Sequence, residues 1–394
     1  MRTNQSIASL PSRFQPDMLR DDRLRYRLRV GRYSRDLVLT RRGCTVEPPS
    51  GDPDAEIVTD AQTWAEMDAG RLSGIEAFAA RRLHVRGSIE KALYFEPAFT
   101  RPNAGGMRYS MERFRIPGGR ISSLVAGDPA APPLLLLHGL GGTGASWLPV
   151  VPELARRYRV FAMDLPGFGA SSKPIGRYDP KWFADRVASL IDALGYDSVL
   201  LAGNSMGGKI SMEVAMRHPD RVVAIACLCP AAAFSRRPAA WFVKLLPPEL
   251  GVFANTLPRG QIKAGLRDLF ADPSRIHETW FDAAIDDFRY VWRSPRARLA
   301  FFASLRSIYL EEPFGERGFW SRLAQMEPPA LFVYGGRDPL ISAGFGEKIK
   351  SVVPRARVLV WDDCGHTPQL EWPERIAPEM IDFFTEVTEA AEAV

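Results

Sequence analysis

A serine flanked by two glycines, between an apolar run and a helical stretch, constrains this chain more than any other feature. Gly203-Asn204-Ser205-Met206-Gly207 follows the apolar run 198–202 and opens the helix-like stretch 208–217. The glycines two residues before and after the serine permit a turn so sharp that larger side chains would collide there. Such a turn lifts the serine hydroxyl into the open and aims nearby backbone N–H groups at the same point. The pattern predicts a strand, a tight turn and a helix, with Ser205 as a candidate nucleophile.

A serine hydroxyl reacts only when a base accepts its proton and a third group orients that base. His366 follows an apolar segment at 356–361, which we expect to be a strand, and Asp338 follows another at 330–334. Ligands in open α/β folds bind at the carboxyl edge of the sheet, where such strands end. We therefore expect His366 as the base and Asp338 as the acid that holds it, both at the edge that carries Ser205.

The other histidines have less suitable positions. His84 belongs to an earlier part of the chain, His218 ends a helical stretch, and His277 lies in a later helical region. His138 ends a strand-like run, where we expect it to bond its own loop. Asp363 is a weaker candidate acid, because it stands only three residues before the candidate base and has poor reach.

Two more motifs identify residues 107–394 as resembling the α/β-hydrolase superfamily, in which the triad follows the chain order serine, acid, histidine. They are His138-Gly139-Leu140-Gly141-Gly142 and Asp164-Leu165-Pro166-Gly167-Phe168-Gly169-Ala170-Ser171. The resemblance implies a mostly parallel sheet and an oxyanion hole made by the backbone N–H groups of Leu140 and Met206. The first glycine-rich segment is then the oxyanion turn, so neither a phosphate-binding loop nor a metal or cofactor site is expected.

The strand pattern of this region agrees with that fold class. The runs 134–137 and 199–202 are apolar throughout, as in parallel strands buried on both faces. Further strands are expected at 111–116, 120–126, 132–138, 159–163, 198–202, 221–227, 330–334 and 356–361. The alternation is interrupted by a helical insertion at 231–326, rich in aromatic residues, which is expected to cap the sheet. Trp241, Phe242 and Trp292 of this cap are candidates for an apolar substrate pocket.

The first part of the chain, 20–98, has an α+β pattern, and a segment rich in proline and glycine, 99–110, links it to the rest. It resembles the sterol-carrier-protein-2 family, although the usual leading helix is short or missing. The resemblance implies a curved sheet around an apolar tunnel, so the part either binds lipid or is a structural accessory. The matching segments are Ala55 to Asp60, Trp64, Asp68 to Leu72, Ala77-Phe78 and Leu83 to Ser88.

Charge and composition add few constraints. The 394 residues carry a formal charge of +5. Arginines alternate with apolar residues in 24–30, which predicts a strand with one wet face. That face is expected to be solvated, with a weak attraction to anionic lipid as the alternative. We expect no nucleic-acid partner and no transmembrane segment. The absence of a signal segment and the four scattered cysteines (44, 227, 229 and 364) favour a cytoplasmic protein with reduced thiols.

These features favour an α/β-hydrolase that cleaves carboxylic esters, with a small and apolar or lipid-like molecule as substrate. A serine at position 205 disfavours epoxide hydrolases and haloalkane dehalogenases, which resemble this chain but have aspartate there. Carbon–carbon bond hydrolysis of vinylogous diketones is the main alternative, because the segment 203–208 resembles the elbow of that group. Those enzymes, however, resemble one another in carrying tryptophan after the histidine, where Thr367 stands here. Cofactor-free haloperoxidase chemistry is more distant. A third hypothesis is that the protein binds or transfers lipid and that its hydrolase part is secondary.

Overall fold

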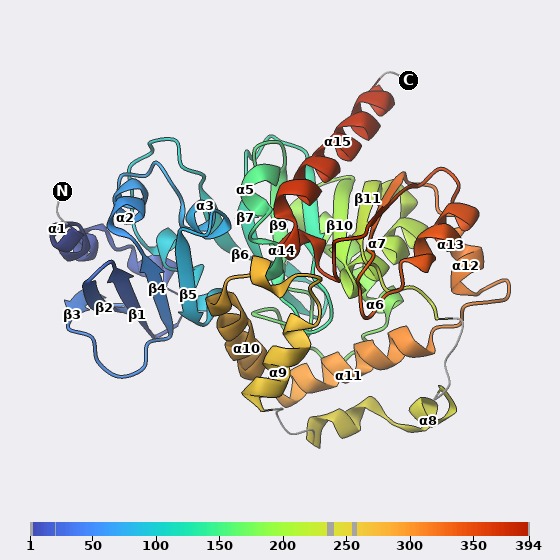
Figure 1. Ribbon diagram of the computed structural model, residues 1–394, viewed down its shortest axis with the longest axis horizontal. Helices are drawn as coiled ribbons and strands as arrows, with labels where there is room; N and C mark the ends of the chain where they lie inside the picture. Colours follow the sequence, from blue (N-terminus) through green and yellow to red (C-terminus); the bar gives the residue numbers. More distant parts are fainter. Residues whose placement is uncertain (1–2, 20, 235–239, 254–257, 393–394) are drawn as a thin grey trace.

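The computed structural model describes residues 3–19, 21–234, 240–253 and 258–392. Two sheets organise these ranges (Figure 1). The first has five strands in the order β3-β2-β1-β4-β5, and the second has eight in the order β13-β12-β11-β10-β8-β9-β7-β6. The first sheet belongs to the N-terminal part of the chain, and the second is the centre of the larger part. The expected combination of a small α+β unit with a mostly parallel sheet is confirmed.

Strand β1 shows the predicted alternation in the N-terminal sheet. Its even-numbered residues from Leu24 to Val30 are buried, and the arginines between them lie on the opposite face. The arginine face is not simply solvated, because Arg25 and Arg27 both pair with the buried carboxylate of Asp36 at 3.1 and 2.8 Å. The strands are β1 (Arg23–Val30), β2 (Tyr33–Thr40), β3 (Gly43–Glu47), β4 (Ala55–Thr59) and β5 (Leu83–Gly87).

Short helices accompany this sheet, and side chains fix where two of them start. Asp60 accepts hydrogen bonds from the backbone of residues 62 and 63, and Ser73 forms a capping box with Glu76. Both arrangements satisfy N–H groups that a helix start leaves without partners. The leading helix is short, as expected. The helices are α1 (Thr3–Ala8), α2 (Ala61–Asp68), α3 (Gly74–Ala79) and α4 (Ile89–Ala92).

The eight-stranded sheet is parallel from β13 to β9, and β7 and β6 extend it in antiparallel fashion. Neighbouring residues of β8 pack on opposite faces, as the apolar run predicts. Leu135 packs with α6, α7 and α13, whereas Leu136 shares a cluster with α5, α15 and the N-terminal core. The strands are β6 (Tyr109–Ile116), β7 (Gly119–Ala126), β8 (Pro133–Leu137), β9 (Arg159–Met163), β10 (Val199–Asn204), β11 (Val222–Leu228), β12 (Ala330–Gly335) and β13 (Arg357–Trp361).

The helices named above bury the two faces of this sheet. They are α5 (Val151–Leu154), α6 (Pro180–Leu194), α7 (Met206–Arg217), α13 (Gly344–Val352) and α15 (Pro373–Glu392), and α14 (Pro368–Glu371) precedes the last of them. Within the described ranges, no helix combines the length and the apolar character needed to cross a bilayer.

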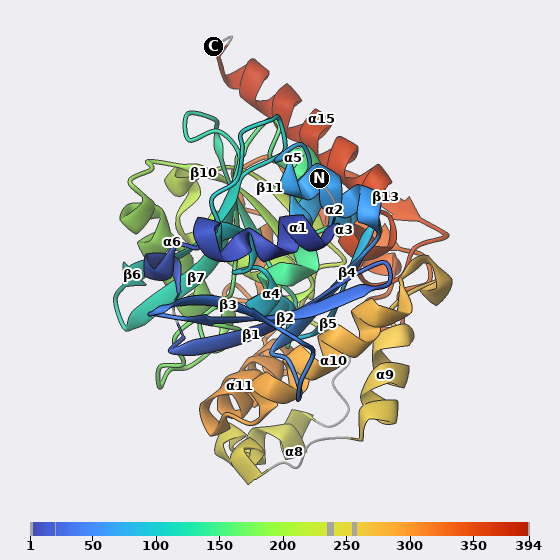
Figure 2. The same cartoon turned by 90° about the vertical axis from the view of Figure 1, so that its left-hand side faces the viewer.

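A helical cap is inserted between β11 and β12 and lies beside one end of the sheet (Figures 1 and 2). Its helix α10 runs along β5, the edge strand of the N-terminal sheet, so the cap contacts both parts of the molecule. Parts of the expected cap range, 235–239 and 254–257, lie outside the described residues. The cap elements are α8 (Ala240–Leu245), the 3-10 segment Pro248–Phe253, α9 (Arg259–Arg267), α10 (Glu278–Trp292), α11 (Pro295–Leu310) and α12 (Phe319–Leu323).

Candidate active site

The turn between β10 and α7 has the tight geometry that its sequence predicts. Ser205 has φ +54° and ψ −113°, a conformation that side chains rarely adopt. A side-chain carbon at position 203 would lie 2.3 Å from the carbonyl carbon of Gly207, and one at position 207 would lie 2.1 Å from the carbonyl oxygen of Leu137. Both positions therefore require glycine, and the strained serine stands between them at the sheet edge.

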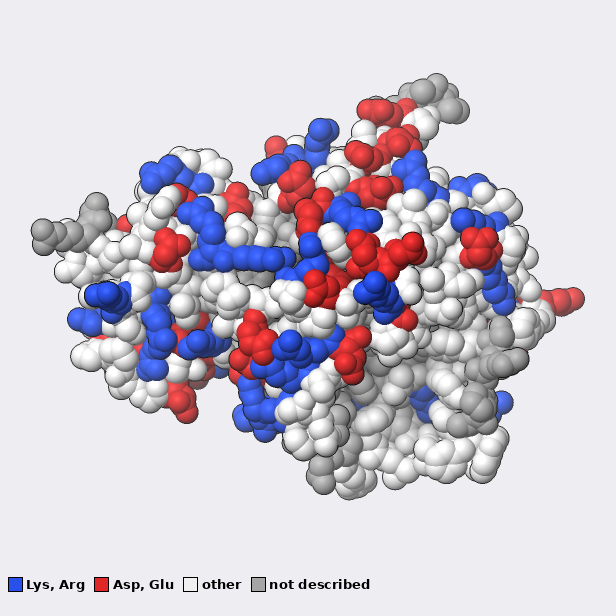
Figure 3. Space-filling model, viewed as in Figure 1, with Lys and Arg blue, Asp and Glu red and all other residues white. Residues whose placement is uncertain are grey.

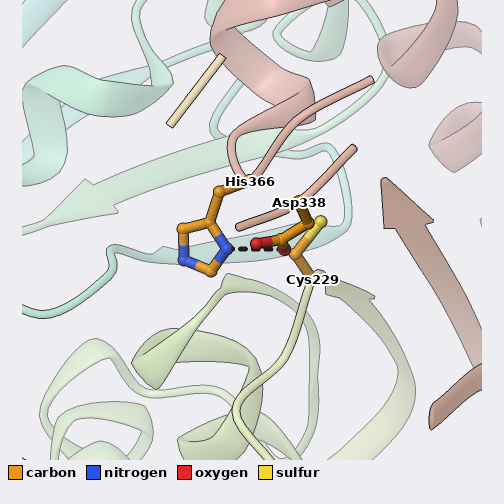
Figure 4. Close-up of side chains that lie close together, drawn as sticks. All are labelled: Cys229, Asp338 and His366. Carbon is orange, nitrogen blue, oxygen red and sulfur yellow. Dashed lines mark hydrogen bonds and ion pairs between the residues drawn. The ribbon is translucent and has the colours of Figure 1, made fainter. Parts of the chain in front are cut away.

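His366 and Asp338 meet at this edge from different loops (Figure 4). The Nδ1 atom of His366 lies 2.7 Å from Oδ2 of Asp338. The other carboxylate oxygen accepts the backbone N–H groups of Leu340 and Ile341 at 2.7 and 2.9 Å. Because a carboxylate only accepts hydrogen bonds, the proton resides on Nδ1, and Nε2 is the basic atom of the ring. The side chain of the aspartate is completely buried and that of the histidine is 5% exposed.

Three hydrogen bonds hold the histidine loop in place. The Asn204 side-chain amide donates to the carbonyl of His366 at 2.9 Å, which joins the loop to the elbow. The backbone N–H of His366 donates to Leu269 of the cap at 2.7 Å. The fully buried Glu371 accepts the N–H of Gly365 at 2.7 Å. The loop that carries the candidate base His366 is thus fixed from three sides.

The predicted oxyanion loop packs directly against the elbow. A side-chain carbon at Gly139 would lie 3.3 Å from the Cβ of Ser205, so Leu140, the next residue, adjoins the nucleophile. His138 bonds its own loop, as expected: Nδ1 lies 2.7 Å from the Gly139 carbonyl, and Nε2 accepts the N–H of Leu165 at 3.0 Å. Burial lowers the pKa of His138, which keeps it neutral. Helix α7 begins at Met206, whose N–H belongs to the first turn and has no acceptor within the helix.

Asp164 supports this loop from below. Its two carboxylate oxygens accept the N–H groups of Gly144 and Ala170, each at 2.8 Å. A side-chain carbon at Gly169, where φ is +46°, would come within 2.2 Å of the same carboxylate. The motif 164–171 therefore supports the oxyanion loop structurally, a role that its sequence alone did not reveal.

Cys229 is a neighbour of Asp338 and His366 that the sequence did not reveal (Figure 4). It lies just beyond the end of β11, at φ +42°. Its sulfur, a carboxylate oxygen of Asp338 and a ring nitrogen of His366 all lie within 4.8 Å of one another. Burial raises the pKa of this thiol well above its usual value, and the neutral thiol donates to the Gly365 carbonyl at 3.5 Å.

The alternatives considered from sequence lie elsewhere. Asp363 is not bonded to the histidine, because its carboxylate pairs with Arg375 at 2.8 Å on the surface. His218 pairs with Asp185 at 3.2 Å. His84 stacks on His277, at a ring-centroid distance of 3.7 Å, at the boundary between the N-terminal sheet and the cap.

The three aromatic pocket candidates have different surroundings. Trp241 and Phe242 are 69% and 49% exposed on the outside of α8, whereas Trp292 is 8% exposed. The Trp292 ring stacks on Phe288 and meets Phe301 edge-on, with centroids 5.1 and 5.4 Å apart. Of the three candidates, only Trp292 therefore belongs to the aromatic layer that it forms with Phe288 and Phe301 above the oxyanion loop.

An apolar groove of about 510 Å³ lies beyond that layer. Phe302 lines the groove and also meets the ring of Phe301 at 5.4 Å. Few charges lie on the nearby surface of the cap (Figure 3). The other lining residues are Val243, Leu246, Pro247, Pro248, Leu250, Gly251, Leu305, Arg306 and Tyr309.

Comparisons with known families agree with this fold and geometry. A family model described as the alpha/beta hydrolase fold matches residues 132–373, and one described as the SCP-2 sterol transfer family matches residues 19–100. The chain belongs to the α/β-hydrolase family, and its N-terminal domain is of the sterol-carrier type.

Similar proteins in this family catalyse several reactions. An acetyltransferase component of the acetoin cleaving system of Pseudomonas putida is 32% identical over 68% of this chain and 67% of its own. A pimeloyl-[acyl-carrier protein] methyl ester esterase of Aeromonas hydrophila is 30% identical over 64% and 95%. The crystal structure of a membrane phospholipase A is 30% identical, with a TM-score of 0.58 over 71% of this chain and 87% of that one. The family is clear, but these relatives do not share one substrate.

Proposed function

We propose that this protein is a serine hydrolase that cleaves carboxylic esters through an acyl-enzyme on Ser205. The observation that carries the proposal is the 2.7 Å bond from His366 Nδ1 to the buried Asp338, at the edge where the strained Ser205 stands. In this reaction Nε2 of the histidine takes the hydroxyl proton while the serine oxygen attacks the ester carbonyl. The same nitrogen then gives the proton to the departing alcohol, and water releases the acid by the same steps in reverse.

The negative charge of each tetrahedral intermediate would be held by the backbone N–H groups of Leu140 and Met206. The contact of Gly139 with the elbow and the start of α7 at Met206 support this assignment. In other enzymes one such donor contributes about 2.7–4 kcal/mol to the transition state. His138 has no role in proton transfer here, because both of its ring nitrogens are engaged in the loop.

An apolar acyl or alcohol group suits the surroundings of the triad. Aromatic rings, including the buried Trp292 and the partly buried Phe301, stand above the oxyanion loop, and the groove beyond them has one charged lining residue, Arg306. Apolar groups of a substrate gain free energy by leaving water for such a surface, at about 25 cal/mol per Å² of buried area.

Carbon–carbon bond hydrolysis is a second candidate because hydrolases named for such substrates are among the relatives. A 2-hydroxymuconate semialdehyde hydrolase of Pseudomonas sp. is 29% identical over 66% of this chain and 89% of its own. Thr367, rather than tryptophan, follows the histidine here, which favours the ester.

A panel of p-nitrophenyl esters of increasing acyl length tests the proposal directly. We expect hydrolysis that favours apolar chains and that disappears in Ser205→Ala, with Ser211→Ala as a matched control on the same helix. Activity that persists in Ser205→Ala would overturn the nucleophile assignment. Cleavage of a dienoic diketone without ester cleavage would instead support the second candidate.

A further inference from the structure

Helix α10 of the cap contacts three parts of the molecule. It runs along β5 of the N-terminal sheet more extensively than along its own cap neighbours α9 and α11, and it also approaches α4 (Figures 1 and 2). The strand β5 is an edge of its sheet, and covering an edge with a helix protects its unpaired backbone groups. The N-terminal domain and the cap are therefore joined by a helix that belongs to the cap.

A pair of stacked imidazoles lies at one end of this junction. His84 of β5 and His277, one residue before α10, lie with their ring planes 20° apart. The Nδ1 atom of His277 lies 2.8 Å from the hydroxyl oxygen of Thr279 and accepts the backbone N–H of the same residue at 3.3 Å. Burial, His277 and Arg86 lower the pKa of His84, so that the stack is favoured in its uncharged form. Protonation of both rings would place two positive charges against each other.

Carboxyl groups from three parts of the chain lie near the other end of α10. Asp287 of α10 is close to Ser88 and Glu90 of the N-terminal domain and to Asp164 below the oxyanion loop. Burial, together with Glu90 and Asp164, raises the pKa of Asp287 to about 8. Burial and Asp164 raise that of Glu90 to about 7, although Lys173 and Arg113 oppose the shift and Asp21 adds to it. At neutral pH the cap therefore meets the N-terminal domain through an uncharged Asp287.

Phe288, which follows Asp287 on α10, lies against Gly141 of the oxyanion loop. A side-chain carbon at Gly141, where φ is +75°, would lie 3.1 Å from Phe301 and 3.6 Å from Phe288, so both rings rest on this glycine. Phe288 in turn stacks on Trp292 of the same helix. A shift of α10 would therefore move two aromatic walls of the space above the nucleophile.

We propose that the N-terminal domain positions the substrate pocket, because it holds α10 so that Phe288 packs on the oxyanion loop. His84, which stacks on His277, and Asp287 are the positioning residues, and none of them touches the reacting atoms. The effect on catalysis rests on the ester hydrolase proposed above, whereas the effect on α10 does not depend on it. The coupling is physical, since one rigid helix carries both the junction and the pocket wall.

Hydrogen exchange of the full chain, followed in peptides from 278–292, tests this directly. We expect faster exchange of α10 in His84→Ala and in Asp287→Ala than in the wild type. Asp287→Asn, which keeps an uncharged side chain of the same shape, should restore the slow exchange. His218→Ala is the matched control, because that imidazole pairs with Asp185 of α6 and not with α10.

The pH dependence separates positioning from a general loss of stability. In the wild type, α10 should exchange faster at acidic pH, where the His84 imidazole becomes charged, and at alkaline pH, where Asp287 ionises beside Glu90 and Asp164. After correction for intrinsic exchange rates, His84→Ala should lose only the acidic change and Asp287→Asn only the alkaline change. In ester assays KM for long acyl chains should rise about fivefold or more in the two alanine variants, with kcat less affected.

The results distinguish the two proposals. Unchanged exchange of α10 in both alanine variants, or the same change in His218→Ala, would overturn the positioning role. If α10 exchanges faster in the two alanine variants but the protein hydrolyses no ester, the result would support the role of the junction in holding α10 and would reject the proposed ester hydrolysis. Faster exchange with unaltered KM and kcat in an active enzyme would show that α10 does not shape the pocket, and would also overturn the proposal.

Discussion

The side-chain amide of Asn204 donates a hydrogen bond to the carbonyl of His366 across 162 positions of sequence, at 2.9 Å. The same amide donates to the carbonyl of Leu228 at 3.1 Å, and the whole side chain is buried. The residue before the nucleophile thus ties the elbow to the loop of the base and to the neighbouring strand. Its position in the motif is explained by this bond rather than by contact with substrate.

Replacing Asn204 by alanine should therefore lower kcat much more than it raises KM, because His366 loses an anchor while the pocket keeps its walls. The carbonyl of His366 would also lose its donor, at a cost of about 1–3 kcal/mol if left without a partner, whereas the carbonyl of Leu228 still accepts the N–H of Ser205 at 2.9 Å. Steady-state kinetics and urea unfolding measure the two effects. A variant with wild-type kcat would show that the loop needs no such anchor.

Asp338→Asn should reduce kcat by about 10⁴-fold, as the equivalent change does in a serine protease. The amide cannot hold the proton on Nδ1 of His366 as the carboxylate does, so the basic nitrogen no longer faces the serine. Pre-steady-state and steady-state rates on one ester measure the loss. Asp363→Asn, which alters a surface pair with Arg375, provides the control and should retain activity.

A buried ion-pair network behind the elbow should make a large contribution to stability. Glu213 of α7 is fully buried and binds the guanidinium of Arg322 through both oxygens, at 2.8 and 2.9 Å. Glu213→Ala leaves Arg322 and the buried Lys209 with Glu311 as the carboxylate that both contact, so a positive charge loses its partner. We expect a loss of about 3–5 kcal/mol in the free energy of unfolding.

Chemical denaturation measures that loss, and a surface pair supplies the comparison. Arg217 also contacts the carboxylate of Asp185, through three hydrogen bonds, but the two side chains are 36% and 47% exposed. Arg217→Ala should cost only about 0.2–1 kcal/mol. Equal losses in the two variants would contradict the burial argument.

Asp287 should make stability depend on pH in a defined direction. Its pKa is raised from 3.8 to about 8 by burial, so between these values the folded chain binds a proton that the unfolded chain has released. The free energy of unfolding therefore falls as pH rises through this window. Urea titrations at about pH 5 and pH 8 should show that the free energy of unfolding of the wild type, relative to that of Asp287→Asn, is lower at the higher pH. A difference that does not change with pH would contradict the shift.

The interior of the N-terminal domain should hold no acyl chain in this conformation. One apolar lining, which includes Phe78, Leu93 and Phe95, surrounds about 40 Å³ of free space. That is far below the roughly 300–1,000 Å³ of a typical small-molecule pocket. Native mass spectrometry of the full chain should therefore give the mass of the polypeptide alone, and a retained lipid in equal amount would contradict this expectation.

Much of the fold could be predicted because its signals are local. The apolar strands, the glycines at 203 and 207 and the order of Ser205, Asp338 and His366 appear in the sequence itself, and the strands of the larger sheet lie within one or two residues of their predicted bounds. The exception is β3, which was not predicted. As an edge strand it has no fully buried residue, so it shows no alternation of buried and exposed positions.

The sequence by itself determined the fold class, the elbow and the three residues proposed for catalysis, because each depends on short-range patterns and on chain order. Only the tertiary structure revealed Asn204 as the anchor of His366, Cys229 as a neighbour of Asp338 and the union of α10 with the N-terminal domain. These contacts join residues far apart in the chain, and packing of whole elements, rather than local preference, brings them together.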